Sequence, residues 1–290
     1  MQSLVTVCSL FLLIFSGRAH VVDDFTNECK EFFYKNFEPK GLGSENHAHI
    51  CQSYSNNYYF ATLYDTCNRI PVYSAYVYQP TTEAPQSSPW HLEPQLIDRT
   101  WDKNMMRIKE MKNTYKITTA LIGKYQAVED DYKNSGYSLG HLNPKGYHGG
   151  DASRATFTLT NVVPQNIKLN GQHWQQYENK LKTIFADCHK TYVLVGAVPS
   201  QDNWLKYNNA NRVNIPDYMW QAYCCVDNND VPIKSGAATA RNDNNPVQEC
   251  SLTSLKSFLH KFNQNREPPE LFANCNAQTT TEGDCSAVIS

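Results

Sequence analysis

The stretch GHLNP at residues 140–144 decides how this sequence is interpreted, together with FTLTNVVPQ at residues 157–165 and LNGQHWQQYE at residues 169–178. It places His141 between a glycine and a turn. The unperturbed pKa of histidine lies near neutrality, which suits a general base, but a histidine in a turn is also commonly a hydrogen-bonded structural residue. The motif alone therefore leaves both roles open.

Apolar and polar residues alternate in several segments that are rich in β-branched and aromatic residues. This pattern predicts β-strands at residues 70–78, 155–165, 190–200 and 231–241. Apolar residues that recur every three or four positions predict helices at residues 100–114, 168–186 and 251–263. Because strands and helices follow one another in irregular order, we expect an α+β fold with an antiparallel sheet.

The organisation of the chain indicates one domain. With 290 residues, of which 41% are hydrophobic, the chain can fill a sizeable core. The sequence has no internal repeat, and the polar residues 79–89 are typical of an exposed loop. We expect one domain over residues 22–275, followed by a flexible tail over residues 276–290.

The N-terminus has the pattern of a secretory signal. Residues 1–19 contain the apolar run LVTVCSLFLLIFSG, which is too short for a comfortable membrane span. Small and polar residues follow, so we predict a signal peptide that is cleaved near Ala19 or His20. We predict no transmembrane segment after it, and we expect a secreted, extracellular protein.

Cysteine usage agrees with an oxidising compartment. Of the 10 cysteines, Cys8 lies in the predicted signal peptide, and the others allow up to four disulfides with one thiol left over. The pairing cannot be read from the sequence, and Cys285 is one candidate for the odd thiol. A zinc site is disfavoured, because the adjacent Cys224 and Cys225 cannot easily bind one tetrahedral ion.

The charge balance limits how the protein could meet nucleic acid. The formal net charge is -2, which excludes a protein that coats nucleic acid by bulk positive charge. Any contact with a phosphate backbone must therefore come from a local patch.

The predicted helix at residues 168–186 carries a distinctive face. Asn170, Trp174 and Glu178 are spaced so that they lie within one broad face of a helix. Each also has a plain structural interpretation: Asn170 as an N-cap, Trp174 as core and Glu178 as a solvated side chain.

Taken together, the three opening motifs resemble the DNA/RNA non-specific endonuclease family, whose active site is a ββα-metal finger. The upstream segments at residues 51–76 and WHLEPQL at residues 90–96 also resemble a secreted branch of that family. The resemblance covers most of the chain beyond residue 19. It implies a nuclease fold in which a central antiparallel sheet is flanked by helices.

The resemblance also implies roles for single residues. His141 matches the family's general base, Asn170 its direct ligand to Mg (or Mn), and Glu178 the residue that holds metal-bound water. These side chains form the expected catalytic and metal site. The expected substrate-binding residues are Asn161, Gln165, Arg154 and Lys182, of which Asn161 and Gln165 also match the positions that organise the site's backbone.

Two departures from the family pattern remove charge that would face the phosphate or the hydrated metal. The family has Asp-Arg before its Gly-His pair, whereas this chain has Ser138 and Leu139. Where many members carry a catalytic arginine, this chain has residues 87–89, SSP. Loss of one electrostatic stabiliser costs about 10²- to 10³-fold in rate at other active sites. The lost charge could be replaced by Arg154, Lys145 or Arg69.

These observations lead to two main expectations. The first is a secreted, Mg-dependent endonuclease that hydrolyses DNA and RNA through contacts with the phosphate backbone, with activity reduced by the loss of the Asp-Arg pair. The alternative is a catalytically weakened relative that binds extracellular nucleic acid or polyanions. A disulfide-rich matrix protein, which needs neither metal nor nucleic acid, is a third possibility. The sequence does not predict an oligomeric state.

Overall fold

The computed structural model describes residues 21–43, 46–78, 80–263, 267–281 and 283–289. The predicted signal peptide at residues 1–19 lies outside this range. Within the described residues, no helix combines the length and the apolar character needed to cross a bilayer.

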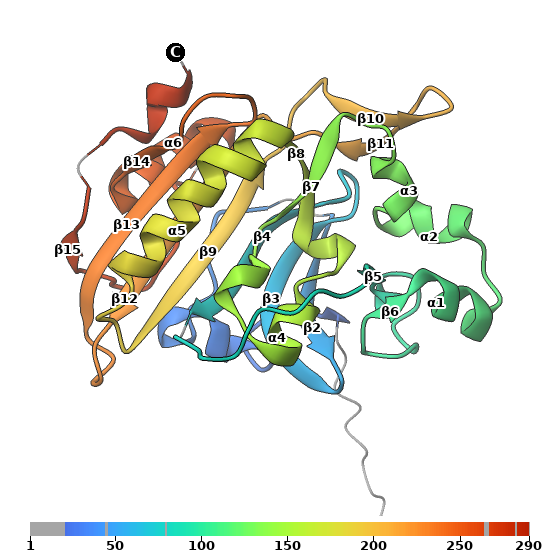
Figure 1. Ribbon diagram of the computed structural model, residues 1–290, viewed down its shortest axis with the longest axis horizontal. Coiled ribbons are helices and arrows are strands. Elements are labelled where there is room, and N and C mark those ends of the chain that lie inside the picture. The colour runs from blue at the N-terminus through green and yellow to red at the C-terminus, as the bar shows by residue number, and fades with distance from the viewer. Residues whose placement is uncertain (1–20, 44–45, 79, 264–266, 282, 290) are drawn as a thin grey trace, which may run out of the picture.

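A nine-stranded sheet forms the centre of the molecule (Figure 1). Its order is β1-β2-β3-β4-β9-β12-β13-β14, and every neighbouring pair in this order is antiparallel. A ninth strand, β15, pairs parallel with β13. The strands are β1 (Val21–Val22), β2 (His47–Tyr54), β3 (Asn57–Asp65), β4 (Ile70–Tyr78), β9 (Lys190–Val198), β12 (Tyr218–Val226), β13 (Pro232–Arg241), β14 (Gln248–Cys250) and β15 (Gln278–Thr279).

Three two-stranded sheets and six α-helices surround this sheet. The small sheets are β5 (His91–Leu92) with β6 (Met106–Arg107), β7 (Tyr137–His141) with β8 (Val162–Asn166), and β10 (Trp204–Tyr207) with β11 (Ala210–Asn214). The helices are α1 (Ile108–Tyr115), α2 (Thr119–Tyr125), α3 (Glu129–Tyr132), α4 (Gly150–Ala155), α5 (Gln175–Ile184) and α6 (Leu252–Phe262). A π-helical turn, η6 (Leu169–Trp174), runs directly into α5.

The main sheet is buried on both faces, because its residues alternate between two apolar cores. In β9, Val193 and Val195 pack in the core that contains Leu181 of α5. Leu194 points the other way, into the core that contains Phe258 of α6. Figure 1 shows α5 in front of the sheet and α6 behind it. This confirms the predicted α+β fold with a central antiparallel sheet flanked by helices.

Most predicted elements form close to their expected bounds. The strands predicted at residues 70–78, 190–200 and 231–241 become β4, β9 and β13, and the helix at residues 168–186 becomes η6 and α5. The helix at residues 251–263 becomes α6, which begins after Ser251, whose side chain accepts a hydrogen bond from the Ser254 N–H.

Two predicted elements are only partly correct. Within residues 155–165, only the part from Val162 onward is a strand, because the preceding residues form the end of α4 and a 3-10 turn, η5 (Leu159–Asn161). Within residues 100–114, the helix starts at Ile108. The residues before it include a turn in which Asp102 accepts a hydrogen bond from Asn104 N–H, followed by β6.

Four disulfides connect the described chain: Cys29–Cys51, Cys188–Cys225, Cys224–Cys275 and Cys250–Cys285. Neighbouring residues on a strand point to opposite faces, so Cys224 and Cys225 on β12 reach different partners. Among the described residues the free cysteine is Cys67, which is exposed, and not Cys285. Cys285 was a wrong candidate because its partner comes from β14, far away in the sequence.

The segment predicted as a flexible tail contacts the sheet. Its strand β15 pairs with β13, and Cys285 is fully buried. The hydroxyl of Thr239 donates to the main-chain oxygen of Cys285. A polar sequence did not reveal these attachments, because the disulfide and the strand pairing both depend on residues elsewhere in the chain.

Candidate active site

The β7–β8 hairpin carries the first candidate residue. Its strands pair antiparallel, with His141 opposite Val162. A Cβ atom on Gly140 would clash with the side chain of Gln165, which is fully buried beside it. The glycine before His141 is therefore required by packing.

His141 lies between two aromatic rings. Its ring centroid is 5.2 Å from that of Trp90 and 5.1 Å from that of Phe157. The residue is half-buried, but its Nε2 atom is inaccessible and has no hydrogen-bond partner among the described residues. Burial and, to a smaller extent, the positive charge of Lys145 lower the pKa of His141 to about 4. The imidazole is therefore neutral at physiological pH, and Nδ1 is the nitrogen left to meet a water.

Asn161 fixes the loop that follows His141. Its main-chain oxygen accepts from Leu142 N–H, and its Oδ1 accepts from Asn143 N–H and from the Ser74 hydroxyl. Its Nδ2 donates to the main-chain oxygens of Asn143 and Thr156. Asn161 is fully buried, so its side chain serves the loop.

The start of the helix leaves Asn170 available. Asn166, not Asn170, caps it, because the Asn166 Oδ1 accepts from the N–H groups of Lys168 and Leu169. Asn170 lies one residue into the π-helical turn, a geometry that is frequent at functional sites. Its Nδ2 donates to Ser138 Oγ on β7, at 3.0 Å. The helix and the hairpin are thus joined at Asn170.

Glu178 lies two turns further along the same helix. Burial raises the pKa of its carboxyl to about 8, although the charge of Lys182 and a hydrogen bond with the Trp174 side chain act in the opposite direction. Trp174 itself is buried in the core. The Tyr147 hydroxyl donates to the main-chain oxygen of Glu178, at 2.8 Å. This bond holds the loop after His141 against α5.

Two lysines supply positive charge to this region. Lys145 is exposed, acts on the His141 imidazole through its charge, and lies 5.7 Å from the Phe157 ring centroid. Lys182 lies 5.7 Å from the Tyr147 ring centroid and acts on the Glu178 carboxyl. A local patch of this kind can meet a phosphate backbone despite the negative net charge of the chain.

The two arginines that could replace the lost charge contact other groups. Arg154 forms an ion pair with Asp151 on its own helix, at 2.7 Å. Arg69 donates to the main-chain oxygens of Arg212 and Lys124, which belong to the β11 and α2 region. Of the three candidates, Lys145 is the one whose charge acts on the His141 imidazole.

The structure brings some predicted residues together and separates others. Asn170 contacts Ser138 on the strand that ends at His141. Glu178 and Lys182 contact Tyr147 in the loop that follows this strand. Asn161 and Gln165 are fully buried. Their buried side chains are placed to organise the backbone of the site, which is the second role that the resemblance implies for them. Arg154 remains half-exposed beside the site's loop but is paired with Asp151.

The donor atoms fit a hydrated magnesium ion better than a dehydrated metal. Among the described residues, no three His, Cys, Asp or Glu side chains converge to hold an ion. Mg²⁺ keeps several waters and binds through few protein oxygens. Because Asn170 gives its Nδ2 to Ser138, its Oδ1 is the oxygen that could bind such an ion.

Several supporting residues were not predicted. Trp90 and Tyr147 reach His141 and Glu178 only through the fold, so no local pattern identifies them. His148 is a structural histidine: its Nε2 is 2.6 Å from Asn143 Oδ1, and burial lowers its pKa to about 4. His148 matches no functional position of the family. Its location in the same glycine-rich loop as His141 could have indicated that it supports this loop.

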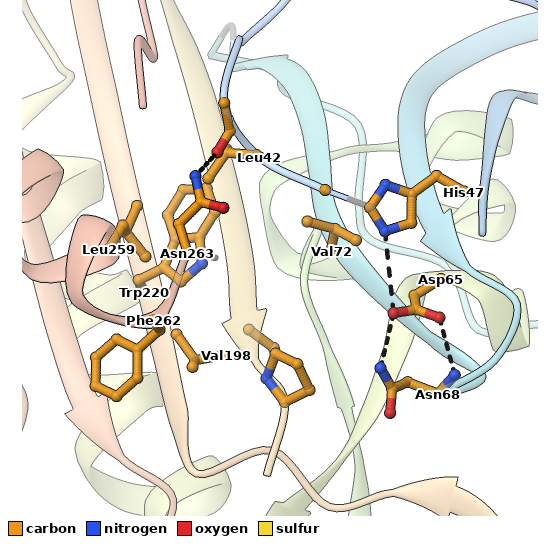
Figure 2. Close-up of a pocket in the computed structure, with 14 residues that line it drawn as sticks. Leu42, His47, Asp65, Asn68, Val72, Val198, Trp220, Leu259, Phe262 and Asn263 are labelled. Carbon is orange, nitrogen blue, oxygen red and sulfur yellow. Dashed lines mark hydrogen bonds and ion pairs between the residues drawn. The ribbon is translucent and has the colours of Figure 1, made fainter. Parts of the chain in front are cut away.

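A cavity lies on the α6 face of the sheet, apart from His141, Asn170 and Glu178 (Figure 2). This cavity, of about 680 Å³, has apolar walls and one polar end formed by His47, Asp65 and Asn68. The Asp65 carboxylate accepts from the N–H groups of Cys67 and Asn68, so it stabilises a turn. None of the described residues that line the cavity is Lys or Arg. It is therefore poorly suited to a phosphodiester.

Comparison with known proteins relates most of the chain to a nuclease family. The sequence profile of the family described as DNA/RNA non-specific endonuclease matches residues 42–277. The chain is 33% identical over 258 residues to mouse "Endonuclease domain-containing 1 protein", covering 86% of this chain and 47% of that protein. It is 31% identical over 262 residues to the human protein of that name, covering 85% of this chain and 47% of the relative.

Other similarities are shorter or more distant. The chain is 28% identical over 107 residues to human "Endonuclease G, mitochondrial", covering 33% of this chain and 36% of that protein. A solved structure titled "Crystal structure of the EndoG/EndoGI complex: Mechanism of EndoG inhibition" aligns with a TM-score of 0.49 at 16% identity, covering 82% of this chain and 89% of that chain. The chain spans about half the length of the endonuclease domain-containing relatives.

Proposed function

Because the chain belongs to the DNA/RNA non-specific endonuclease family, we propose that it hydrolyses phosphodiester bonds in both DNA and RNA, in the extracellular space and with Mg²⁺ or Mn²⁺. One observation carries the proposal: Asn170 is hydrogen-bonded to Ser138, three residues before His141 on the same strand. The proposed base and the proposed metal ligand therefore belong to one rigid unit.

His141 serves as the general base in this proposal. Its neutral imidazole accepts the proton of a water at Nδ1 while the water oxygen attacks phosphorus, and the bond from phosphorus to the leaving oxygen breaks. The aromatic rings of Trp90 and Phe157 hold the imidazole and limit its exposure. With a pKa of about 4, the ring is already in the form that accepts a proton at neutral pH.

Asn170 Oδ1 would hold the metal ion, and Glu178 would orient water bound to it. When bound, the ion supplies positive charge to a phosphate oxygen and to the leaving oxygen. The carboxyl of Glu178 is positioned by Trp174 and by the anchoring of its main chain to Tyr147. A nearby cation favours the carboxylate form of a buried acid.

Lys145 and Lys182 would contact the phosphate backbone. Contacts of this kind carry no base information, which agrees with cleavage that ignores sequence and sugar. Lys145 is exposed and beside the base, so it can supply part of the charge that the family's arginine provides. Arg154 gives one N–H to Asp151, and its other N–H groups could still contact a phosphate.

One observation favours the second candidate, a weakened relative that binds extracellular nucleic acid or polyanions. Leu139, at the position of the family's arginine, is half-buried and packs against the main apolar core. It cannot supply charge, and Ser138 is neutral. A site that keeps Lys145 and Lys182 but cuts slowly would still bind a polyanion.

Cleavage of plasmid DNA and of single-stranded RNA by the purified chain tests the proposal. We expect cutting of both with Mg²⁺, loss of cutting with EDTA, and recovery when Mg²⁺ is added back. The His141→Ala variant, purified in the same way, controls for a contaminating nuclease. A folded protein that retards DNA on a gel but never cuts it would overturn the enzyme and support the binder.

A further inference from the structure

We infer that Ser138 is the positioning residue that turns the Asn170 carbonyl oxygen toward a divalent cation, in the place where the family has aspartate. This inference rests on the proposed function. Its basis is a chain of two hydrogen bonds: Asn170 Nδ2 donates to Ser138 Oγ, and Ser138 Oγ donates to the main-chain oxygen of Gln165, each at 3.0 Å.

The direction of both bonds follows from the number of protons available. A main-chain carbonyl oxygen can only accept, so the single hydroxyl proton of Ser138 is committed to Gln165. Ser138 Oγ can then only accept from Asn170. The group of Asn170 that faces Ser138 must be the NH₂ group, and Oδ1 must face away from it.

The anchor of this chain is rigid. Gln165 belongs to β8, is fully buried, and lies opposite Ser138 in the β7–β8 register. Asn170 is not needed as a cap, because Asn166 satisfies the first N–H groups of the helix. The amide of Asn170 is therefore free to serve another group, and the hydroxyl of Ser138 decides which end it offers.

Orientation matters here because the site offers one neutral ligand. An amide binds a cation through oxygen, and the reversed amide would present NH₂ to the ion. Groups that orient a metal ligand typically affect metal affinity by about 10- to 100-fold. Serine orients Asn170 as an aspartate could, but it adds no negative charge.

The experiment measures Mn²⁺ affinity in the absence of nucleic acid, by electron paramagnetic resonance of free Mn²⁺, for the wild-type chain and four variants. We expect Ser138→Ala to weaken Mn²⁺ binding about 10-fold or more. Ser138→Thr, which keeps the hydroxyl, should retain the wild-type Kd, and Ser138→Asp should bind more tightly because it adds a charge. Asn170→Ala should lose the site.

The outcomes separate this inference from the proposed function. If Ser138→Ala binds Mn²⁺ as the wild type does while Asn170→Ala does not, Ser138 has no positioning role and the metal site stands. If Ser138→Thr binds as weakly as Ser138→Ala, the hydroxyl is not responsible and the inference fails. If the wild-type chain binds no Mn²⁺, the metal site of the proposed function fails first. Unchanged circular dichroism spectra confirm that each variant is folded.

Discussion

Two histidines on opposite faces of the main sheet differ in the charge that surrounds them. His47 faces the α6-side cavity and lies 3.9 Å from the Asp65 carboxylate. His141 lies on the α5 side, where Lys145 acts on it through its positive charge. A histidine beside an aspartate is the more familiar sign of a general base. A phosphodiester, however, needs cations, and these lie on the side of His141.

A carboxylate beside a histidine has to be judged together with its other hydrogen-bond partners. Asp65 divides its carboxylate among several partners: Oδ1 holds the turn after β3 through main-chain N–H groups, and its charge only partly offsets the burial that lowers the pKa of His47. His141 has no such partner among its ring contacts, and its neutral form is maintained by burial. Burial therefore keeps this imidazole unprotonated where no carboxylate is present, but it also weakens the base, because the lowered pKa reduces its affinity for a proton.

Exchanging each histidine for glutamine is the strongest way to break the comparison. We expect His141→Gln to lower the rate of plasmid cleavage by about 10²- to 10⁴-fold, because glutamine cannot accept the proton of water. His47→Gln should cut at the wild-type rate. Initial rates at saturating Mg²⁺ measure both. Equal losses of rate in the two variants would contradict the assignment of His141, and not His47, as the catalytic base.

The helix that carries Asn170 and Glu178 shows how much of the local structure the sequence predicts. Its existence follows from local periodicity, and its bounds of 169–184 lie close to the predicted 168–186. An N-cap was the structural alternative for Asn170, but the cap belongs to Asn166. Both asparagines suit a helix start, and only the backbone geometry of the π-helical turn decides between them.

Several contacts of the candidate site join residues that are distant in the sequence. One of the hydrogen bonds that fix Asn161 comes from Ser74, 87 positions away. Trp90 packs on His141 although 51 positions separate them in the sequence. β12 was not predicted, because its sequence, YMWQAYCCV, is buried along its length and does not alternate. Such contacts exist only once the sheet has assembled.

Removing Lys145 sharpens the comparison, because it tests whether cations mark the functional face. We expect Lys145→Ala to slow cleavage by about 10²- to 10³-fold, the cost of one electrostatic stabiliser. Lys180→Ala is the matched control: Lys180 lies on α5 but pairs with Glu249. Both lysines are exposed, so neither change should disturb folding. A similar loss in both variants would indicate a general effect of net charge.

The pH dependence gives the smallest but most specific effect. A base must be neutral, so at saturating Mg²⁺, where the cation keeps Glu178 ionised, the His141 pKa of about 4 means that the rate should hold as pH falls and decline only near pH 4. Lys145→Gln removes a like charge, so the pKa of His141 should rise and the decline should begin at higher pH. Trp90→Ala should move the pKa of His141 further toward the ordinary value of about 6.5, because burial is the larger cause.

The measurement is kcat/KM on an oligonucleotide across pH at constant ionic strength, with Lys180→Gln as control. If the decline lies near pH 6.5 in the wild type and does not move in Trp90→Ala, burial by the aromatic rings is not what prepares this base.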